Sequence, residues 1–213
     1  MDTWKYENLF YLTSKKSRLL KLIDQYEIYK KILNVKGDIV ECGVFKGASL
    51  IRLATFRDLI ENSRKRKILG FDSFGKFPIP KLNVNKNSDI NFAKRHDKNI
   101  GIGIAIEKLK FFLKKKKIKN FDLIKGNVIN TIPKYFENKK NKIALLHLDL
   151  DIYEPTEFVL NYLVKRIPKG GVILLDDYKH IKGATLATDN FIKNNKLKIK
   201  KVSKKGRPSF IQI

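Results

Sequence analysis

The stretch that decides the fold is residues 37–50, which read GDIVECGVFKGASL. Its apolar run ending in an acidic residue predicts a buried strand over residues 39–42. A glycine turn follows over residues 43–47, and the next helix is expected to begin at Ala48 or Ser49. Such a turn exposes backbone N–H groups at the positive end of the helix dipole. Because the stretch lacks both the dinucleotide fingerprint and the P-loop ending, it predicts a ligand-binding turn of another kind.

Strands and helices alternate along the rest of the chain. The other expected strands cover residues 67–71, 121–125, 142–148 and 172–175, with a closing antiparallel pair at 197–202 and 208–213. The expected helices cover residues 14–33, 49–60, 107–117, a segment that Pro155 opens, and 183–193. This alternation predicts an α/β fold with a doubly wound, mostly parallel Rossmann-like sheet and a C-terminal antiparallel hairpin. Right-handed crossovers would place the carboxyl ends of the first five strands at one edge. We expect a single domain over residues 1–213.

Two segments do not follow the alternation. Residues 1–13 are rich in aromatic side chains and are expected to be irregular; with the helix after them they form an N-terminal arm at residues 1–36. Residues 73–106 contain Pro78, Pro80 and several asparagines. Irregular segments of this length in a compact domain are usually functional or disordered. We therefore predict that residues 73–106 form a lid over the substrate.

The composition is strongly basic, with 46 Lys and Arg residues against 21 Asp and Glu residues and a net charge of +25. Such a charge favours polyanions as partners. The excess is nearly all lysine and is spread along the chain, so we interpret it as coding bias, although nucleic-acid binding stays open. No apolar run has the length of a membrane span, and Cys42 is the single cysteine. These features predict a cytoplasmic protein.

Acidic side chains follow the fourth and fifth predicted strands. Asp149 and Asp151 stand two residues apart and can face the same edge of the sheet, while Asp176 and Asp177 end the neighbouring strand. Adjacent strands lie about 4.8 Å apart. Carboxylates this close repel one another unless a cation lies between them. Ligands that are all oxygen select Mg²⁺, Ca²⁺ or Mn²⁺ over zinc, so this pattern predicts a divalent metal site.

Other polar residues have more than one interpretation. Glu41 and Asp72 end the first and second strands, where carboxylates can accept hydrogen bonds from ligand hydroxyls or an amine. His147 lies within a strand and is interpreted as a packed, hydrogen-bonded core residue. His96 falls in the predicted lid, where it could contact substrate or solvent. His180 is the alternative to an aspartate as a proton acceptor.

Residues 41–49 resemble motif I of the class I S-adenosylmethionine-dependent methyltransferases. They are similar in particular to the macrocin O-methyltransferase (TylF-like) family, which methylates sugar hydroxyls. Four further stretches agree in order: GFDSF at residues 70–74, KGNVINTIP at 125–133, LDLDIYEPT at 148–156 and GGVILLDDY at 170–178. The similarity extends over residues 14–213.

The resemblance implies a site for S-adenosylmethionine. The implied cofactor-binding residues are Glu41, Gly43, Val44, Phe45, Gly47, Ser49, Asp72, Ser73, Gly126, Asn127 and Asp149. In this scheme Asp72 binds the cofactor ribose, and Gly43 and Gly47 let its methionine part approach the backbone. Gly126 and Asn127 would lie near the adenine. The resemblance also implies Mg²⁺, held by Asp149, Asp176 and Asp177 with acceptor hydroxyls completing the shell.

These expectations combine into a Mg²⁺-assisted O-methyltransferase acting on a sugar hydroxyl of a nucleotide sugar or glycan precursor. Asp149 and Asp151 are the predicted catalytic residues, with Asp151 taking the hydroxyl proton. One alternative is a catechol-type O-methyltransferase with the same metal chemistry. Another is a basic nucleic-acid-binding protein on the same fold; the Asn/Asp-Pro-Pro-Tyr tetrapeptide of amino-methylating enzymes is absent, which counts against a methylating version. Whether the chain forms a homo-oligomer stays open.

Overall fold

One sheet runs through the molecule. The structure is a computed structural model that describes residues 2–80 and 88–213. Within these residues the strands are β1 Asp38–Cys42, β2 Ile68–Asp72, β3 Phe121–Lys125, β4 Ile143–Leu148, β5 Val172–Leu175, β6 Ile199–Lys201 and β7 Ser209–Gln212, in the spatial order β3-β2-β1-β4-β5-β7-β6. Strands β1 to β5 are parallel, and β7 is antiparallel to both β5 and β6. The predicted fold class, including the closing hairpin, is confirmed.

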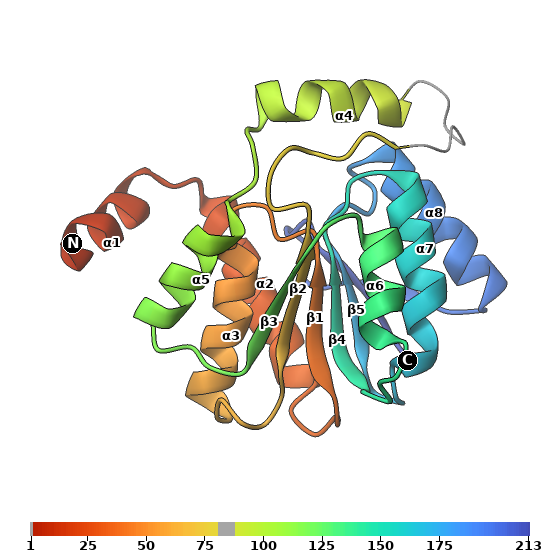
Figure 1. Ribbon diagram of the computed structural model, residues 1–213, viewed down its shortest axis with the longest axis horizontal. Helices are drawn as coiled ribbons and strands as arrows, with labels where there is room; N and C mark the ends of the chain where they lie inside the picture. Colours follow the sequence, from red (N-terminus) through yellow and green to blue (C-terminus); the bar gives the residue numbers. More distant parts are fainter. Residues whose placement is uncertain (1, 81–87) are drawn as a thin grey trace.

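Helices cover both faces of this sheet (Figure 1). They are α1 Thr3–Thr13, α2 Lys16–Lys31, α3 Ala48–Ile60, α4 Ser88–Asn99, α5 Ile106–Lys115, α6 Val128–Phe136, α7 Tyr153–Leu163 and α8 Lys182–Asn194, with a 3₁₀ turn at Val164–Arg166. One apolar core joins α2, α3 and α5 to the sheet, and a second joins α6, α7 and α8 to its other face. All six residues of β4 are buried. A central parallel strand is covered on both sides, which explains why every residue of β4 except His147 is apolar.

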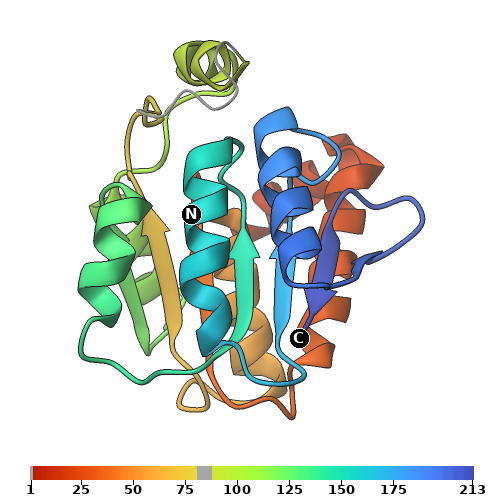
Figure 2. The same ribbon diagram turned by 90° about the vertical axis from the view of Figure 1, so that its right-hand side faces the viewer.

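The carboxyl ends of the parallel strands meet at one edge, and α4 lies above that edge (Figure 2). This is the arrangement that right-handed crossovers impose. It brings together residues that follow β1, β2, β3, β4 and β5, although they are far apart in the sequence. None of the described helices combines the length and apolar character needed to cross a membrane.

Buried arginines hold the opposite edge of the sheet. Arg66 donates to Glu61 at 2.7 and 2.8 Å and to the carbonyl oxygens of Val35 and Gly37. Tyr29 of α2 donates its hydroxyl hydrogen to the same glutamate. These bonds tie the end of α2 to the start of β1 and β2, because each arginine N–H reaches a different segment.

Residues 3–13 are helical rather than irregular. Helix α1 begins after Asp2, whose side chain accepts a hydrogen bond from the backbone N–H of Lys5 at 3.1 Å. This is an N-cap, and an aspartate just before an aromatic-rich run is the signal that could have predicted the helix. The helix projects from the body (Figure 1) and leaves Trp4 73% and Leu12 84% exposed.

The predicted lid also contains a helix. Within residues 73–106, helix α4 covers Ser88–Asn99 and buries Asp89, Ala93 and His96 on one side. These residues are four and three positions apart, which is the spacing of one face of a helix. Because most residues of the segment are polar, this spacing was not recognised in the sequence. The part of the predicted lid at residues 81–87 lies outside the described residues.

Candidate active site

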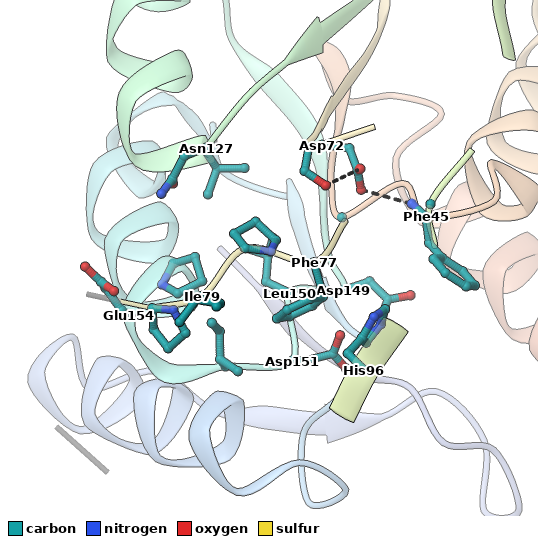
Figure 3. A pocket seen from close by; sticks show the side chains of 18 of the residues that line it. Phe45, Asp72, Phe77, Ile79, His96, Asn127, Asp149, Leu150, Asp151 and Glu154 are labelled. Atoms are coloured by element: carbon teal, nitrogen blue, oxygen red, sulfur yellow. Dashed lines mark hydrogen bonds between the residues drawn. The ribbon is translucent and has the colours of Figure 1, made fainter. Parts of the chain in front are cut away.

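A pocket opens at the carboxyl ends of β1 to β4, beneath α4 (Figure 3). Eight of the residues predicted as site residues line it: Gly43, Phe45, Asp72, Ser73, Gly126, Asn127, Asp149 and Asp151. The predicted lid contributes eight more: Gly75, Phe77, Pro78, Ile79, Pro80, His96, Ile100 and Gly103. The glycine turn and the aspartates after β4 therefore face one continuous space.

Asp72 fastens the glycine turn to the end of β2. One carboxylate oxygen accepts hydrogen bonds from the backbone N–H groups of Val44 at 2.7 Å and Phe45 at 3.0 Å. The other accepts from the N–H of Phe74 at 2.6 Å and from the hydroxyl of Ser73 at 3.4 Å. A carboxylate has about four acceptor positions, so any ligand hydroxyl at Asp72 would share oxygens that already hold the backbone.

The glycines of the turn are required by the protein's own packing. Gly43 has φ +88°, and a Cβ atom there would lie 1.8 Å from the carbonyl oxygen of Asp149. Gly47 has φ +83°, and its Cβ would lie 2.6 Å from a methyl group of Leu109. Both positive φ angles and both close approaches need glycine. Gly43 also lines the pocket, whereas the missing side chain at Gly47 makes room for α5.

Four of the residues predicted to bind the cofactor do not line the pocket: Glu41, Val44, Gly47 and Ser49. Glu41 is fully buried and accepts a hydrogen bond from the hydroxyl of Ser49. His147, on β4, is also fully buried and lies 3.5 Å from the Glu41 carboxylate and 4.0 Å from that of Asp176. Burial alone lowers the pKa of His147, but Asp176 and Glu41 raise it to about 9. The two carboxylates therefore favour the charged form of the ring, which lies between the glycine turn and the acidic cluster.

Aspartates crowd the edge beside the pocket. Asp149, Asp151 and Asp177 can each place one oxygen within 4.8 Å of the others. Asp177 accepts a hydrogen bond from the backbone N–H of Asp151 at 3.0 Å. Asp151 has φ +64°, a left-handed conformation that aspartate and asparagine adopt more readily than most residues. The bend after β4 thus aims two aspartates at the end of β5.

Crowding shifts the acidity of these groups. Burial and the charge of Asp176 raise the pKa of Asp149 to about 6. Burial and the charges of Asp149 and Asp176 raise the pKa of Asp151 to about 7, and the pKa of Asp177 is raised for the same kind of reason. Burial would also raise the pKa of Asp176, but His147 and Lys21 lower it below its ordinary value. Like charges in a poorly solvated place cannot all ionise freely.

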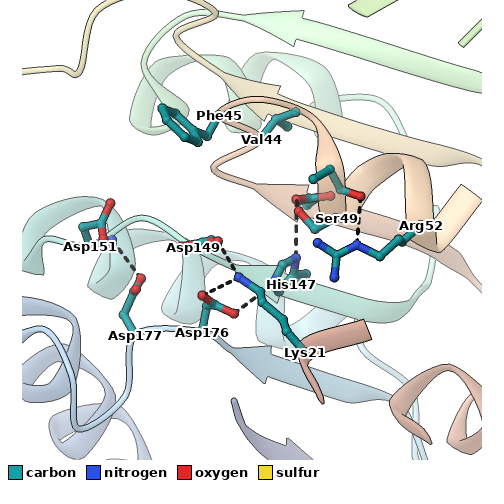
Figure 4. Close-up of polar contacts among 12 residues, drawn as sticks. Lys21, Val44, Phe45, Ser49, Arg52, His147, Asp149, Asp151, Asp176 and Asp177 are labelled. Atoms are coloured by element: carbon teal, nitrogen blue, oxygen red, sulfur yellow. Dashed lines mark hydrogen bonds and ion pairs between the residues drawn. The ribbon is translucent and has the colours of Figure 1, made fainter. Parts of the chain in front are cut away.

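A lysine that the sequence analysis missed lies among these acids (Figure 4). The Lys21 ammonium is 2.7 Å from a carboxylate oxygen of Asp176 and 3.6 Å from one of Asp149. It comes from α2, 155 residues before Asp176. Nothing local marks this lysine among so many others, because only the packing of α2 against the sheet brings it to the strand ends.

The donor set fits a hard divalent cation. Asp149, Asp151 and Asp177 form an all-carboxylate group, and His147, Asp149 and Asp176 form a second, overlapping group. Crowded carboxylates with raised pKa values are groups that a cation would stabilise in their ionised form. The predicted ligands Asp149, Asp176 and Asp177 are divided between the two groups, so magnesium and its ligand set stay a prediction.

Aromatic contacts attach α4 to the pocket. The rings of Phe77 and His96 lie 4.3 Å apart between centroids, and His96 also contacts the edge of Phe45. Asp97, next to His96, accepts a hydrogen bond from the backbone N–H of Phe77 at 3.0 Å. The lid segment and the helix above it therefore hold each other over the glycine turn.

A second, more polar cavity lies between α4 and the start of α8. Its lining includes the basic side chains of Arg95, His180 and Lys182, and the amides of Asn91 and Asn99. It adjoins the first pocket, since His96 and Ile100 line both. Burial and the charges of Arg207 and Lys201 lower the pKa of His180, which shows how positive its surroundings are.

Comparison with known proteins gives a family match over most of the chain. The model of the family described as macrocin-O-methyltransferase (TylF) matches residues 13–206. Demethyldecarbamoylnovobiocin O-methyltransferase of Streptomyces niveus is 27% identical over 152 residues, which are 68% of this chain and 54% of that protein. A tetracenomycin-pathway 4'-O-methyltransferase of Streptomyces olivaceus, acting by its name on a dimethoxy-rhamnosyl compound, is 26% identical over 150 residues, with the same shares. The chain spans about half the length of these relatives.

Solved structures share the fold. The calicheamicin methyltransferase CalS11 superposes with a TM-score of 0.82 at 24% identity, covering 100% of this chain and 86% of that one. The O-methyltransferase NovP gives a TM-score of 0.78 at 21% identity, covering 90% of this chain and 78% of that one. At these identities the likeness establishes the architecture.

Proposed function

Because this chain belongs to the macrocin-O-methyltransferase (TylF) family, we propose that it is an S-adenosylmethionine-dependent O-methyltransferase that methylates a sugar hydroxyl. The observation that carries the proposal is the single pocket that joins the glycine turn to the aspartates after β4. A methyl donor at the turn and an alcohol at the aspartates would then meet in one space closed from above by α4.

The cofactor end of the pocket is assigned to the turns after β1, β2 and β3. Asp72 and Ser73 would face the ribose, and Gly126 and Asn127 the adenine, since all four line the pocket. Glu41 and Ser49 are buried behind the turn and would hold it in shape. Phe45 and Phe77 would cover the bound cofactor together with His96 and limit the access of water.

The acceptor end is assigned to the acidic cluster. We assign Mg²⁺ to Asp149, Asp177 and a third carboxylate. The family resemblance implies that the third is Asp176, whereas the packing favours Asp151. When bound, S-adenosylmethionine supplies the methyl group and the cation makes the acceptor hydroxyl more acidic. Asp151 would accept the hydroxyl proton, because its carboxylate lines the pocket beside Asp149.

The acceptor is proposed to be a sugar that carries a phosphate or diphosphate. The Streptomyces olivaceus relative is named as a methyltransferase of a rhamnosyl compound, and a solved structure of CalS11 is described as that of a TDP-rhamnose 3'-O-methyltransferase. The pocket itself offers carboxylates but no lysine or arginine among the described residues. The cavity beside it, with the cationic side chains of Arg95 and Lys182, would hold the anionic part of such an acceptor.

Further features of the chain follow from this proposal. We propose that residues 1–213 work as one domain, with residues 73–106 as a lid that closes over the cofactor. Cytoplasmic location and self-association also remain our proposals. The exposed aromatic face of α1 is the surface that we expect a second copy to contact.

Calorimetric titration with S-adenosylhomocysteine, with and without Mg²⁺, tests the proposal. We expect binding at micromolar concentrations in both conditions. No binding at all would overturn the enzyme assignment, whereas binding combined with no heat or stability change on adding Mg²⁺ would remove only the metal. A panel of nucleotide sugars and catechols with radiolabelled S-adenosylmethionine then identifies the acceptor.

The nucleic-acid alternative needs its own measurement. A polynucleotide that binds tightly at 150 mM salt, with a steep loss of affinity at higher salt, would favour that alternative. We expect the weak binding of a diffuse basic surface instead, lost at physiological salt.

A further inference from the structure

The acidic cluster already contains a cation of the protein's own. The Lys21 ammonium forms ion pairs of 2.7 Å with Asp176 and 3.6 Å with Asp149, and its side chain is only 18% exposed. Both partners belong to the set of carboxylates to which we assign Mg²⁺. The lysine therefore occupies carboxylate oxygens that a divalent ion would also use.

Two other cations, His147 and Arg52, also lie near the cluster. His147 lies on the buried side, between Glu41 and Asp176. Arg52, on α3, donates its Nε hydrogen to the carbonyl oxygen of Ala48; its charge interacts with those of Asp176 and Asp149, but no ion pair within 4.0 Å joins it to them. Within the described part of the chain, Lys21 is thus the basic side chain that reaches the cluster from its partly open side.

The backbone of Lys21 is fixed, but its ammonium can move. Helix α2 is anchored by the buried Ile28 and Ile32 and by the bond from Tyr29 to Glu61. A lysine side chain has four rotatable bonds and carries a compact, well-hydrated charge, so it can leave the carboxylates without moving the helix.

We propose that Lys21 is the internal counter-ion of this site, which neutralises Asp149 and Asp176 when no divalent cation is bound and competes with that cation for their oxygens. The inference rests on the magnesium site of the proposed function. When the cation binds, Asp176 exchanges its ammonium partner for the metal. Asp149 and Asp176 are thereby paired with a positive charge in either state, which a poorly solvated place requires of buried carboxylates.

The test measures metal affinity without the cofactor. Binding of Mn²⁺ is followed by the electron paramagnetic resonance signal of the free ion for the wild type, Lys21→Met and Lys30→Met. Lys30 lies on the same helix and pairs with Glu27 at the surface, so it is a matched control. We expect Lys21→Met to bind Mn²⁺ at least tenfold more tightly than the wild type, because a competing positive charge has been removed. Lys30→Met should bind it as the wild type does.

Three results would overturn the inference: unchanged affinity in Lys21→Met, weaker affinity in it, or no Mn²⁺ binding by the wild type at millimolar concentration. Titration with S-adenosylhomocysteine on the same samples separates such a failure from a failure of the methyltransferase assignment.

A measurement on the unaltered protein covers the case in which Lys21→Met does not fold. Amine acetylation followed by peptide mass spectrometry should show Lys21 labelled several times faster in the presence of Mg²⁺, with Lys30 unaffected. Equal labelling of Lys21 with and without Mg²⁺ would contradict the exchange.

Discussion

Asp72 shows how one side chain can serve the fold and the site together. Its carboxylate receives the backbone N–H groups of Val44, Phe45 and Phe74. Hydrogen bonds to a charged acceptor contribute about 1.5–3 kcal/mol each. We expect Asp72→Ala to lower the free energy of unfolding by about 3 kcal/mol in urea denaturation. Ser73→Ala, which removes one contact of 3.4 Å, is the control and should lose less than about 0.5 kcal/mol. Equal urea midpoints for Asp72→Ala and the wild type would show that the Asp72 carboxylate does not hold the glycine turn.

Asp151 is the residue whose substitution separates chemistry from stability. Asparagine keeps the left-handed conformation at φ +64° but cannot accept the proton. We expect Asp151→Asn to lower kcat about 100-fold or more with the best acceptor from the panel. Its melting temperature should equal or exceed that of the wild type, since one of the crowded negative charges is gone. Full activity in this variant would transfer the role of base to another residue, His180 being the next to test.

Some residues of the candidate site could be predicted from the sequence, and others could not. The aspartates could be placed at strand ends because each follows an apolar run directly. Lys21 could not, because its role arises from an ion pair across 155 positions of sequence. The buried link from Glu41 through His147 to Asp176 was missed for the same reason: the contacts join three different strands.

At the scale of elements, the parallel strands were predictable and several helices were not. A strand buried on both faces is apolar over nearly all of its length, as in β4, where His147 is the exception, so such strands can be predicted from the sequence. Helices α1 and α4 carry mixed polar and aromatic residues, and the N-cap Asp2 of α1 was a weaker signal than an apolar run. Helix α6 begins at Asn127, whose side chain caps the N–H of Ile129 at 3.0 Å, yet the segment after the third strand stayed unassigned.

The junction of α2, α3 and β2 gives a pH-dependent prediction. Burial alone raises the pKa of the Glu61 carboxyl, but hydrogen bonds from Arg66 and Tyr29 bring it below its ordinary value. A lowered pKa stabilises the fold above the unfolded value of about 4.3, and this contribution is lost as the pH falls through the folded pKa. We expect Glu61→Gln to cost about 3 kcal/mol at pH 7, because Arg66 stays buried without its counter-charge.

The pH series supplies the check on that junction. The difference between Glu61→Gln and the wild type should be constant from pH 7 to about 5 and should shrink below about pH 4.3. Glu27→Gln removes an exposed pair on α2 and should change stability by less than about 0.5 kcal/mol throughout. If the stability difference between Glu61→Gln and the wild type grew as the pH fell, the result would contradict the role given to Glu61.

At the scale of the whole molecule, charge is the property that the fold does not explain. The chain has 46 basic residues and 21 acidic ones, so most of its cations have no carboxylate to pair with. Several of the acids are gathered at the candidate site and the Glu61 junction. The remaining surface is therefore dominated by lysines that repel one another, and this repulsion opposes the compact state.

Salt should consequently stabilise this protein. At 20 mM NaCl the repulsion acts across the molecule, whereas at 300 mM the Debye length is shorter than the spacing of most surface lysines. We expect the free energy of unfolding in urea to rise by about 1 kcal/mol between these conditions. The double variant Lys204→Glu/Lys205→Glu, in an exposed loop, lowers the net charge and should reduce the gain. A loss of stability with salt would mean that attractive ion pairs, such as those of Lys21 and Arg66, outweigh the repulsion of the lysine-rich surface.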